Sequence, residues 1–374
     1  MIAALAAISQ RPEFLSEIAP KVEHTSEGIK IHFNMFFKGK PTTVTIDDKL
    51  PFIKPSFFEW LFGKRPTLIY ARSSNDDNLY LTSLFEKAVV NLVCNNDYKN
   101  SEGIRTNFVF SLFSDCLTSY SRWFRNDSKN NFLSYLKAEI DCKSSVVMGI
   151  KPNLIYNPEL FYKNGHTFVV MDYNLEYKAI MLYNPNLGRK YFSLSKNLPD
   201  SLTKKADTNK GELWITLDQL EKRRISIESL SSKNMYKSVF QVNKKLELKS
   251  YIENYFIVEF SCKVNIKEAS TFMINVSIFT LNLMSVDFGV FTDDTEKREI
   301  KVKYELPFGF IPNLNKQKGE AKTIVYQKFK LQPNKYIFRL ALFYKEIRVE
   351  KAELLFKIGS TSDCNFEEHI KDEI

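Results

Sequence analysis

The apolar positions of the chain change their spacing once, near residue 235. Before that point helical and strand-like patterns alternate, and after it only strand-like runs occur. Residues 2–9 are apolar on all sides, which predicts a buried helix, and residues 79–93 have apolar positions at helical spacing. Residues 28–52 hold two alternating runs around Lys38-Gly39-Lys40, which predicts a β-hairpin. The pattern therefore predicts an α+β protein.

Strand-like runs fill the last third of the chain. They follow one another between residues 255 and 359, and turn-forming or charged segments separate them. Strands at such short intervals are typical of an antiparallel β-sandwich, which we expect at residues 236–360. Residues 361–374 are polar and acidic and are expected to form a fraying tail.

Length and composition agree with more than one domain. A chain of 374 residues is expected to form two or three domains, and its hydrophobic content of 44% is enough for packed cores. The polar segment 125–131 is the best candidate for a linker in the first part of the chain. The sequence therefore predicts three units, 1–124, 125–232 and 236–360, followed by the tail.

The cysteines and the charge argue against several classes of protein. The five cysteines are widely separated, and none forms a C-x-x-C pair. This spacing argues against a disulfide framework and a zinc site, and it favours a reducing, cytoplasmic location. No apolar run is long enough to span a bilayer. The formal charge is +9, but basic and acidic residues are mixed and form no dense basic stripe, so no nucleic-acid partner is expected.

Residues 164–188 carry the candidate chemistry. His166 begins a run of β-forming residues, and a turn and a second apolar run lead from it to Asn184-Pro185. Two adjoining strands would bring His166 and Asn184 together. In a cysteine protease an imidazole takes the thiol proton, and an amide oxygen holds the other ring N–H. A single His beside a strand is also common as a structural residue, so the pattern leaves both interpretations open.

Several short motifs occur in the order in which calpains carry them, and together the chain resembles the calpain family of papain-like cysteine proteases. The motifs are Ile46-Asp47-Asp48-Lys49-Leu50-Pro51, Leu84-Phe85-Glu86-Lys87-Ala88, Gly165-His166, Asn184-Pro185, Gly211-Glu212-Leu213-Trp214 and Leu331-Gln332-Pro333-Asn334-Lys335-Tyr336-Ile337. The resemblance implies a papain-like core with a helical first subdomain (1–124) and a β-rich second subdomain (125–232). A C2-like β-sandwich (236–360) would follow the core.

The resemblance also implies which residues act. His166 and Asn184 would be the catalytic His and Asn of a Cys/His/Asn site. The nucleophilic Cys would precede Met1, where the Ala-rich run 1–8 looks like the family's catalytic helix without its beginning. Neither that Cys nor the upstream Gln of the oxyanion hole is present in this sequence. Cys94 and Cys116 do not replace it, because a low-pKa thiol prefers a helix N-terminus beside a His.

Calcium is implied by the resemblance and opposed by the residues. Glu86 and Glu212 are the calcium candidates, but Lys210 stands where the family has an acidic residue. A lysine offers no oxygen and repels a hard cation. Glu86 could equally be a surface acid of its helix. The Trp that follows Asn-Pro in the family is replaced by Asn186, which removes a shield from the His/Asn hydrogen bond.

Three functions remain open at this stage. The first is a calpain-like intracellular endopeptidase that cuts protein substrates, with a segment upstream of Met1 missing from the record. The second is a non-catalytic calpain homologue that binds proteins or membranes. The third is a lipid-binding module in which the β-sandwich contacts acidic phospholipid, an interpretation that rests on the mild basicity and on the C2-like resemblance.

Overall fold

The chain folds into two compact units in a computed structural model. Unit 1 comprises Met1–Cys116 and Tyr120–Ser231, and unit 2 comprises Leu117–Ser119 and Ser232–Ile374. The structure describes residues 1–11, 14, 16, 18–37, 40–64, 67–68, 80–98, 104, 106–114, 117–123, 129–151, 166–185, 198–208, 211–220, 224–232, 235–247, 250–251, 255–279, 283–293, 298–305, 322–345 and 351–368. The predicted linker 125–131 lies mostly outside these residues.

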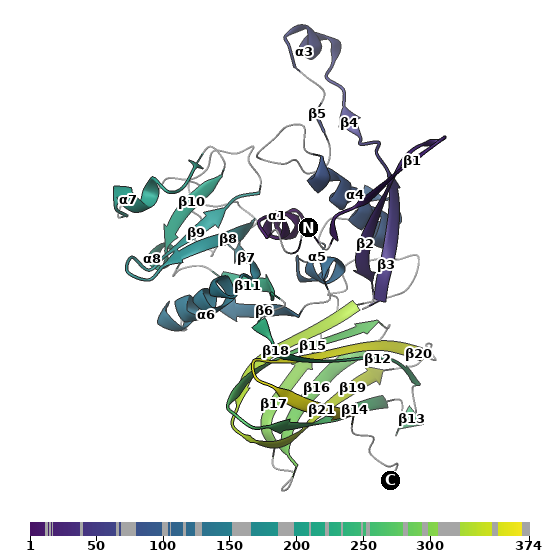
Figure 1. The fold of residues 1–374 in the computed structure, drawn as a ribbon, viewed down its shortest axis with the longest axis vertical. Coiled ribbons are helices and arrows are strands. Elements are labelled where there is room, and N and C mark those ends of the chain that lie inside the picture. The colour runs from purple at the N-terminus through teal and green to yellow at the C-terminus, as the bar shows by residue number, and fades with distance from the viewer. Residues whose placement is uncertain are drawn as a thin grey trace. The chain divides into compact units, whose positions relative to one another are not determined.

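Helices and short sheets alternate in the first part of unit 1 (Figure 1). The described helices of unit 1 as a whole are α1 (Ile2–Ser9), α3 (Phe57–Leu61), α4 (Leu81–Cys94), α5 (Thr106–Phe113), α6 (Lys129–Asp141), α7 (Asp200–Thr203) and α8 (Leu217–Leu220). Its first strands are β1 (Lys21–Thr25), β2 (Gly28–Phe37), β3 (Lys40–Asp47), β4 (Phe52–Ile53) and β5 (Thr67–Leu68).

Helix α1 is the buried centre of unit 1, as its all-round apolar sequence predicts. It packs against α4 and α5 on one side and against β7 (Ser145–Lys151) and β8 (His166–Asn174) on the other (Figure 1). The Ser145 hydroxyl donates to the Ala7 carbonyl at 3.3 Å and so ties the helix to the sheet. Arg11 donates to the Ser144 carbonyl at 2.9 Å just beyond the helix end. These hydrogen bonds therefore fix the helix to the start of β7, which pairs with the strand that His166 begins.

The predicted hairpin around residues 38–40 is confirmed by β2 and β3, which pair antiparallel with Lys30 opposite Asp47. Strand β1 extends it to a three-stranded sheet, so the expectation of a helical first subdomain is incomplete. The sequence analysis missed β1 because four of its five residues are exposed and it has no apolar alternation. Helix α4 confirms the helix predicted at 79–93.

Helix α5 was not predicted from the sequence. Seven of its eight residues are buried, including Asn107, so no polar face marks its periodicity. Its Phe and Val residues also favour strands in isolation. The side chain of Glu228 accepts the backbone N–H of Asn107 at 2.7 Å, near the start of the helix. Asn107 and Glu228 are 121 residues apart in the sequence, so no local pattern could reveal their contact.

A six-stranded sheet forms the rest of unit 1, in the order β10-β9-β8-β7-β11-β6. The strands not yet bounded are β6 (Thr118–Trp123), β9 (Ala179–Tyr183), β10 (Glu212–Thr216) and β11 (Arg224–Leu230). Helix α6 packs on β7 and β8 and buries Phe132, Leu133 and Leu136 with residues of the sheet. The pairs β10–β9, β9–β8, β8–β7 and β7–β11 are antiparallel.

Unit 2 consists of strands wherever its regular elements are described. A four-stranded sheet has the order β12-β20-β15-β18, and a second sheet has the order β13-β14-β19-β16-β17, with β21 pairing with β14. The strands are β12 (Ser238–Glu247), β13 (Ser250–Tyr251), β14 (Tyr255–Ile266), β15 (Ser270–Phe279), β16 (Leu283–Thr292), β17 (Arg298–Glu305), β18 (Lys322–Leu331), β19 (Asn334–Lys345), β20 (Lys351–Ser360) and β21 (Cys364–Glu368).

The two sheets of unit 2 share one hydrophobic core. Residues of β14, β16 and β19 from one sheet pack with residues of β15 and β20 from the other. Phe272 stacks on Phe329 with ring centroids 5.9 Å apart and meets Phe338 edge-on at 5.6 Å. Aromatic pairs of this kind stabilise a core beyond their area of contact. The described strands between residues 238 and 360 are therefore antiparallel and pack around a shared core.

The prediction that the chain frays after residue 360 is wrong for residues 364–368. These residues form β21, whose Phe366 lies opposite Val264 of β14 and stacks on Phe240 at 5.6 Å. Acidic residues in this segment suggested solvation, but alternate side chains on a strand can face opposite sides. Among the described residues, no helix has the length and apolarity that crossing a membrane would require.

Candidate active site

His166 is the first residue of β8 and lies opposite Ile150 of β7. Its ring meets the ring of Phe168 edge-on, with centroids 4.8 Å apart, so an aromatic side chain supports the imidazole from within the same strand. The side chain is half-buried. A central strand of the sheet therefore fixes the position of the imidazole.

Asn184 follows β9 directly and is only 2% exposed. Its backbone N–H donates to the Gly211 carbonyl at 2.9 Å, next to the β9–β10 pairing that begins with Tyr183 opposite Glu212. Gly211 has φ +86°, a conformation that side-chain-bearing residues rarely adopt. A glycine at this position thus allows the turn that holds Asn184 in place.

The structure brings the two predicted site residues together. His166 Nε2 lies 2.8 Å from Asn184 Oδ1. An amide oxygen only accepts hydrogen bonds, so Nε2 is the protonated ring nitrogen and Nδ1 is the basic nitrogen of the neutral ring. The expectation that His166 and Asn184 meet across adjacent strands is confirmed as geometry.

Burial lowers the pKa of His166 below its usual value, and the hydrogen bond to Asn184 opposes that effect. Desolvation disfavours the charged imidazolium, so the ring is neutral at pH 7. A neutral imidazole whose tautomer is fixed through Nε2 can accept a proton at Nδ1. The arrangement is suited to general-base chemistry.

The two buried cysteines, Cys94 and Cys262, do not resemble an activated nucleophile. Burial raises the pKa of Cys94, at the C-terminal end of α4, to about 11. Burial also raises the pKa of Cys262, which lies in unit 2. Cys116 lies outside the described residues. The prediction that Cys94 does not replace the missing nucleophile agrees with its burial, because low-pKa thiols need nearby positive charge or a helix N-terminus.

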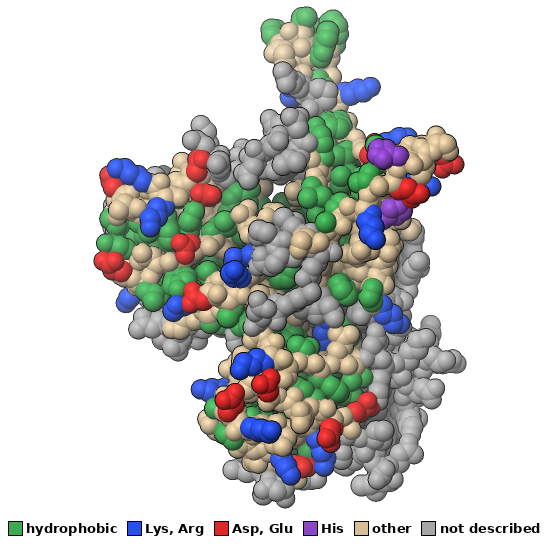
Figure 2. Space-filling view, in the orientation of Figure 1, with side chains coloured by type: hydrophobic (Ala, Val, Ile, Leu, Met, Phe, Trp, Pro, Cys, Tyr) green, Lys and Arg blue, Asp and Glu red, His purple; other side chains and the backbone are tan. Residues whose placement is uncertain are grey.

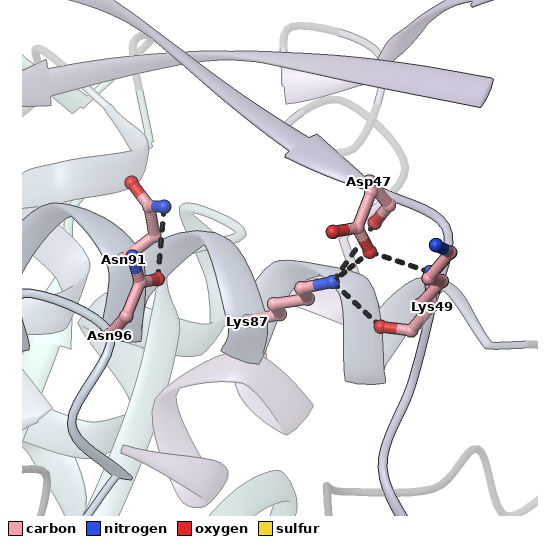
Figure 3. Close-up of polar contacts among 5 residues, drawn as sticks. All are labelled: Asp47, Lys49, Lys87, Asn91 and Asn96. Atoms are coloured by element: carbon pink, nitrogen blue, oxygen red, sulfur yellow. Dashed lines mark hydrogen bonds and ion pairs between the residues drawn. The ribbon is translucent and has the colours of Figure 1, made fainter. Parts of the chain in front are cut away.

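Two of the family-like motifs meet in space at the end of β3 (Figure 3). Lys87 of α4 donates to the Asp47 carboxylate at 2.5 Å and to the backbone carbonyl of Lys49 at 2.6 Å. The same carboxylate accepts the Lys49 backbone N–H at 2.8 Å. The hydrogen bond from Lys87 and, to a smaller extent, that from Lys49 hold the pKa of Asp47 below its usual range. These contacts fasten the sheet β1–β3 to α4, which itself packs on α1.

Glu86, one of the two calcium candidates, is fully buried on α4. The alternative that it is a surface acid of the helix is therefore wrong. The Tyr98 hydroxyl donates to its Oε1 at 2.5 Å, so this carboxylate already has a protein partner. Apolar periodicity could not reveal this burial, because an acid on the packed face of a helix depends on a partner from another segment.

Glu212, the other candidate, closes a short loop. Its carboxylate accepts the backbone N–H of Asp207 at 2.9 Å, and its own N–H donates to the Asp207 carbonyl at 3.0 Å. In the described parts of the chain, no three His, Cys, Asp or Glu residues are grouped so that they could hold a metal ion. Calcium needs six to eight oxygen ligands, so the two described glutamates do not make a calcium site. Lys210 and Asn186 lie outside the described residues.

The contacts of several other residues near His166 and Asn184 were not predicted from the sequence. Phe168 and Gly211 belong to stretches already quoted, but their contacts depend on strand pairing. Trp214 of β10 is 2% exposed, and among the described residues its indole N–H has no hydrogen-bond partner. It packs with Ala179, Leu198 and Leu202 in a small core behind β9 and β10.

One comparison with known proteins gives a family match for the first part of the chain. Residues 1–181 match a family model described as calpain family cysteine protease. This range includes His166 and ends just before Asn184. The comparison with curated proteins gave no match.

The similar solved structures are distant. They include an isomalto-dextranase of Arthrobacter globiformis T6 complexed with panose, at 8% identity and TM-score 0.21, covering 41% of this chain and 27% of that one. Dimeric latent PorU from Porphyromonas gingivalis has 10% identity and TM-score 0.19, covering 65% and 23%. The infectious bursal disease virus Gx strain structure has 8% identity and TM-score 0.23, covering 64% and 70%.

The first two structures are much longer than the segments that match, since the chain covers about a quarter of each. TM-scores this low do not establish a common fold, and these likenesses carry no argument about function. The family match agrees with the motifs and with the His166–Asn184 geometry. Residues 1–181 match the calpain family of cysteine proteases, and this match supports membership of that family.

Proposed function

We propose that this chain carries the His/Asn part of a calpain-type endopeptidase site that cuts intracellular proteins. The observation that carries the proposal is the 2.8 Å hydrogen bond between His166 Nε2 and Asn184 Oδ1. It orients Nδ1 as the proton acceptor, which is the role of His in a Cys/His/Asn site. By the family resemblance, the nucleophile of such a site would be a cysteine at the N-terminus of α1, and the given sequence contains no cysteine there.

The proposed chemistry is acyl transfer to a thiolate. His166 Nδ1 takes the thiol proton, and the thiolate attacks the peptide carbonyl carbon. The resulting imidazolium returns the proton to the leaving amine as the C–N bond breaks, which leaves a thioester. His166 then takes a proton from water, and the hydroxide cleaves the thioester to release the acid and the thiol. Asn184 stays hydrogen-bonded to Nε2 throughout and keeps the ring orientation.

The fold that we propose for this chemistry is a papain-like core of two subdomains, 1–124 and 125–232, followed by a C2-like β-sandwich at 236–360. Contacts between α1 and β8 support it, because the N-terminus of a helix beside the His strand would favour a thiolate by its dipole. Protein substrates and a cytoplasmic location belong to this proposal, and nucleic acid does not. The described residues give calcium no role in the mechanism.

The test compares the chain as written with a chain extended upstream by a Gln…Cys-Trp segment. The extended chain should cleave a fluorogenic peptide, and its His166→Ala variant should lose the cleavage. A His24→Ala variant is the matched control, because His24 is an exposed residue of β1 away from the site. The unextended chain should show at most the ~10³–10⁴-fold enhancement over water that survives loss of a triad member. Strong His166-dependent cleavage by the unextended chain would contradict the proposed nucleophile.

A second candidate is a non-catalytic calpain homologue that binds proteins or membranes. The observation that favours it is the burial of Cys94 and Cys262, which keeps both thiols protonated, together with Asn186 in place of the family's Trp. In this reading His166 and Asn184 keep their hydrogen bond only for stability. An extended chain that folds but leaves the peptide intact would support this candidate and reject the first. Binding of acidic phospholipid through the β-sandwich belongs with this second candidate.

A further inference from the structure

The segment between β4 and β5 exposes an unusual run of large apolar side chains. Phe52 and Ile53 of β4 are exposed, and five further apolar residues follow on and just after α3. We call those five the aromatic tip: Phe57, Phe58, Trp60, Leu61 and Phe62. Their exposed fractions lie between 61% and 86%. Figure 2 shows hydrophobic side chains gathered over α3, and Figure 1 shows α3 beyond β4 and β5.

No residue of α3 is buried. The Phe57 ring contacts the Phe58 ring at 5.9 Å and the Trp60 ring at 6.4 Å, so the side chains of the tip pack mainly on one another. The other exposed large apolar residues described, such as Val22, Leu175 and Val239, come from separate strands or turns. Single exposed residues of that kind are ordinary, whereas a contiguous patch marks a binding surface.

The tip is nevertheless a well-formed element. Ser56 and Glu59 form a capping box at the start of α3, with the Ser56 backbone N–H donating to Glu59 at 2.9 Å. The Glu59 carboxylate also accepts from Lys64 at 2.5 Å. Hydrogen bonds from Lys64 and then from Ser56 lower the pKa of Glu59 to about 2. The one acidic side chain of residues 52–64 is thus paired, and the helix turn does not depend on a covering partner.

Basic residues flank the apolar segment on both sides. Lys54 precedes the tip and Lys64 follows it, and both are exposed. Arg65 comes next in the sequence. A short apolar helix with a tryptophan and flanking lysines matches the headgroup boundary of a bilayer, where aromatic rings enter the interface and lysines meet anionic headgroups.

We propose that the aromatic tip inserts into the interface of an anionic lipid membrane. At 100° per residue, Phe57, Phe58, Trp60 and Leu61 cover an arc of about 160° on α3, and Glu59 lies on the opposite side. A short helix with one apolar, aromatic face lies naturally in the plane of a lipid interface, and the flanking lysines complement the charge of anionic headgroups. The tip contains neither His166 nor Asn184, and the proposal does not rest on peptidase activity.

The test uses the full chain and vesicles of phosphatidylcholine with or without phosphatidylserine. Wild-type chain should sediment with phosphatidylserine vesicles. The variant Phe57→Ser/Trp60→Ser/Phe62→Ser should bind at least about tenfold more weakly, because it removes three of the inserting side chains. The matched control Val22→Ser/Leu175→Ser/Val239→Ser removes three exposed apolar side chains elsewhere and should bind like wild type.

The role of the lysine charges and the insertion of Trp60 into the lipid are tested separately. Each of Lys54→Gln and Lys64→Gln should weaken binding to the anionic vesicles about fivefold, with little change at neutral ones. Trp60 fluorescence should shift to the blue on vesicle addition. The Trp60→Phe variant should keep most of the binding and lose most of that shift, which separates insertion of the tip from contact elsewhere.

Three results would overturn the proposal. The first is wild-type chain that fails to bind phosphatidylserine vesicles. The second is binding that persists unchanged in the Phe57/Trp60/Phe62 variant, which would assign lipid contact to another surface, such as unit 2. The third is concentration-dependent self-association of the chain without lipid binding, abolished by the same variant, which would make the tip a contact between copies.

Discussion

Replacing Asn184 by Ala tests whether the site is a coupled pair. The side chain is 2% exposed, and its Oδ1 accepts the His166 Nε2 hydrogen at 2.8 Å. Losing a neutral hydrogen bond costs about 0.5–1.5 kcal/mol, and leaving a partly buried N–H without an acceptor raises the cost to ~1–3 kcal/mol. The backbone hydrogen bond to Gly211 is kept. We expect the melting temperature of unit 1 to fall by about 2–10 °C.

Tryptophan fluorescence during urea unfolding measures this loss in the correct unit. The three tryptophans of the sequence, Trp60, Trp123 and Trp214, all belong to unit 1. The exposed Asn34→Ala serves as the matched control and should change stability by less than about 0.5 kcal/mol.

A double-mutant cycle isolates the pair itself. Asn184→Ala and His166→Ala should be non-additive by at least about 0.5 kcal/mol, because each removes the same hydrogen bond. Additivity within ~0.3 kcal/mol would refute the reasoning, since it would mean that the two side chains do not stabilise one another.

Three further predictions concern stability. Burial lowers the pKa of His166 in the folded state, so below about pH 6.5 the unfolded chain binds more protons than the folded chain. The stability of the wild-type chain should therefore fall as the pH decreases through that range. In calorimetry from pH 8 to 5, the melting temperature of the His166→Ala variant should fall less than that of wild type. Lys87→Met breaks the contacts to Asp47, which is half exposed, so the loss should be only ~1 kcal/mol by urea unfolding; no loss would contradict a fastening role. Gly359→Ala would place a Cβ 2.8 Å from the Tyr236 ring, so unit 2 should lose about 1–3 kcal/mol by circular dichroism, and an unchanged midpoint would contradict that close packing.

The sequence predicted the site better than the elements around it. His166 and Asn184 were expected to meet because each stands at the end of an apolar run, and a hairpin joins such ends. Helix α5 was missed because burial on all sides erases helical periodicity, and β1 was missed because exposure on both faces erases strand alternation.

Contacts between distant segments were beyond sequence patterns. The burial of Glu86 depends on Tyr98, and the role of Lys87 depends on Asp47 at the end of another element. The polar residues among 364–368 suggested a fraying tail, but these residues pair with β14 as a strand. The exposure of the aromatic tip was also not predicted, because apolar residues in a short irregular stretch are ordinarily expected to be covered.

The most direct test of the account is the reactivity of a cysteine placed before Met1. In the chain extended by Gln…Cys-Trp, the rate of alkylation by iodoacetamide is followed against pH, with the unextended chain as background. If the start of α1 faces His166, the profile should have its midpoint well below the ordinary thiol pKa of about 8.5, and His166→Ala should return it toward that value. A midpoint near 8.5 that His166→Ala leaves unchanged would contradict the account, because the thiol and the imidazole would then not form one site.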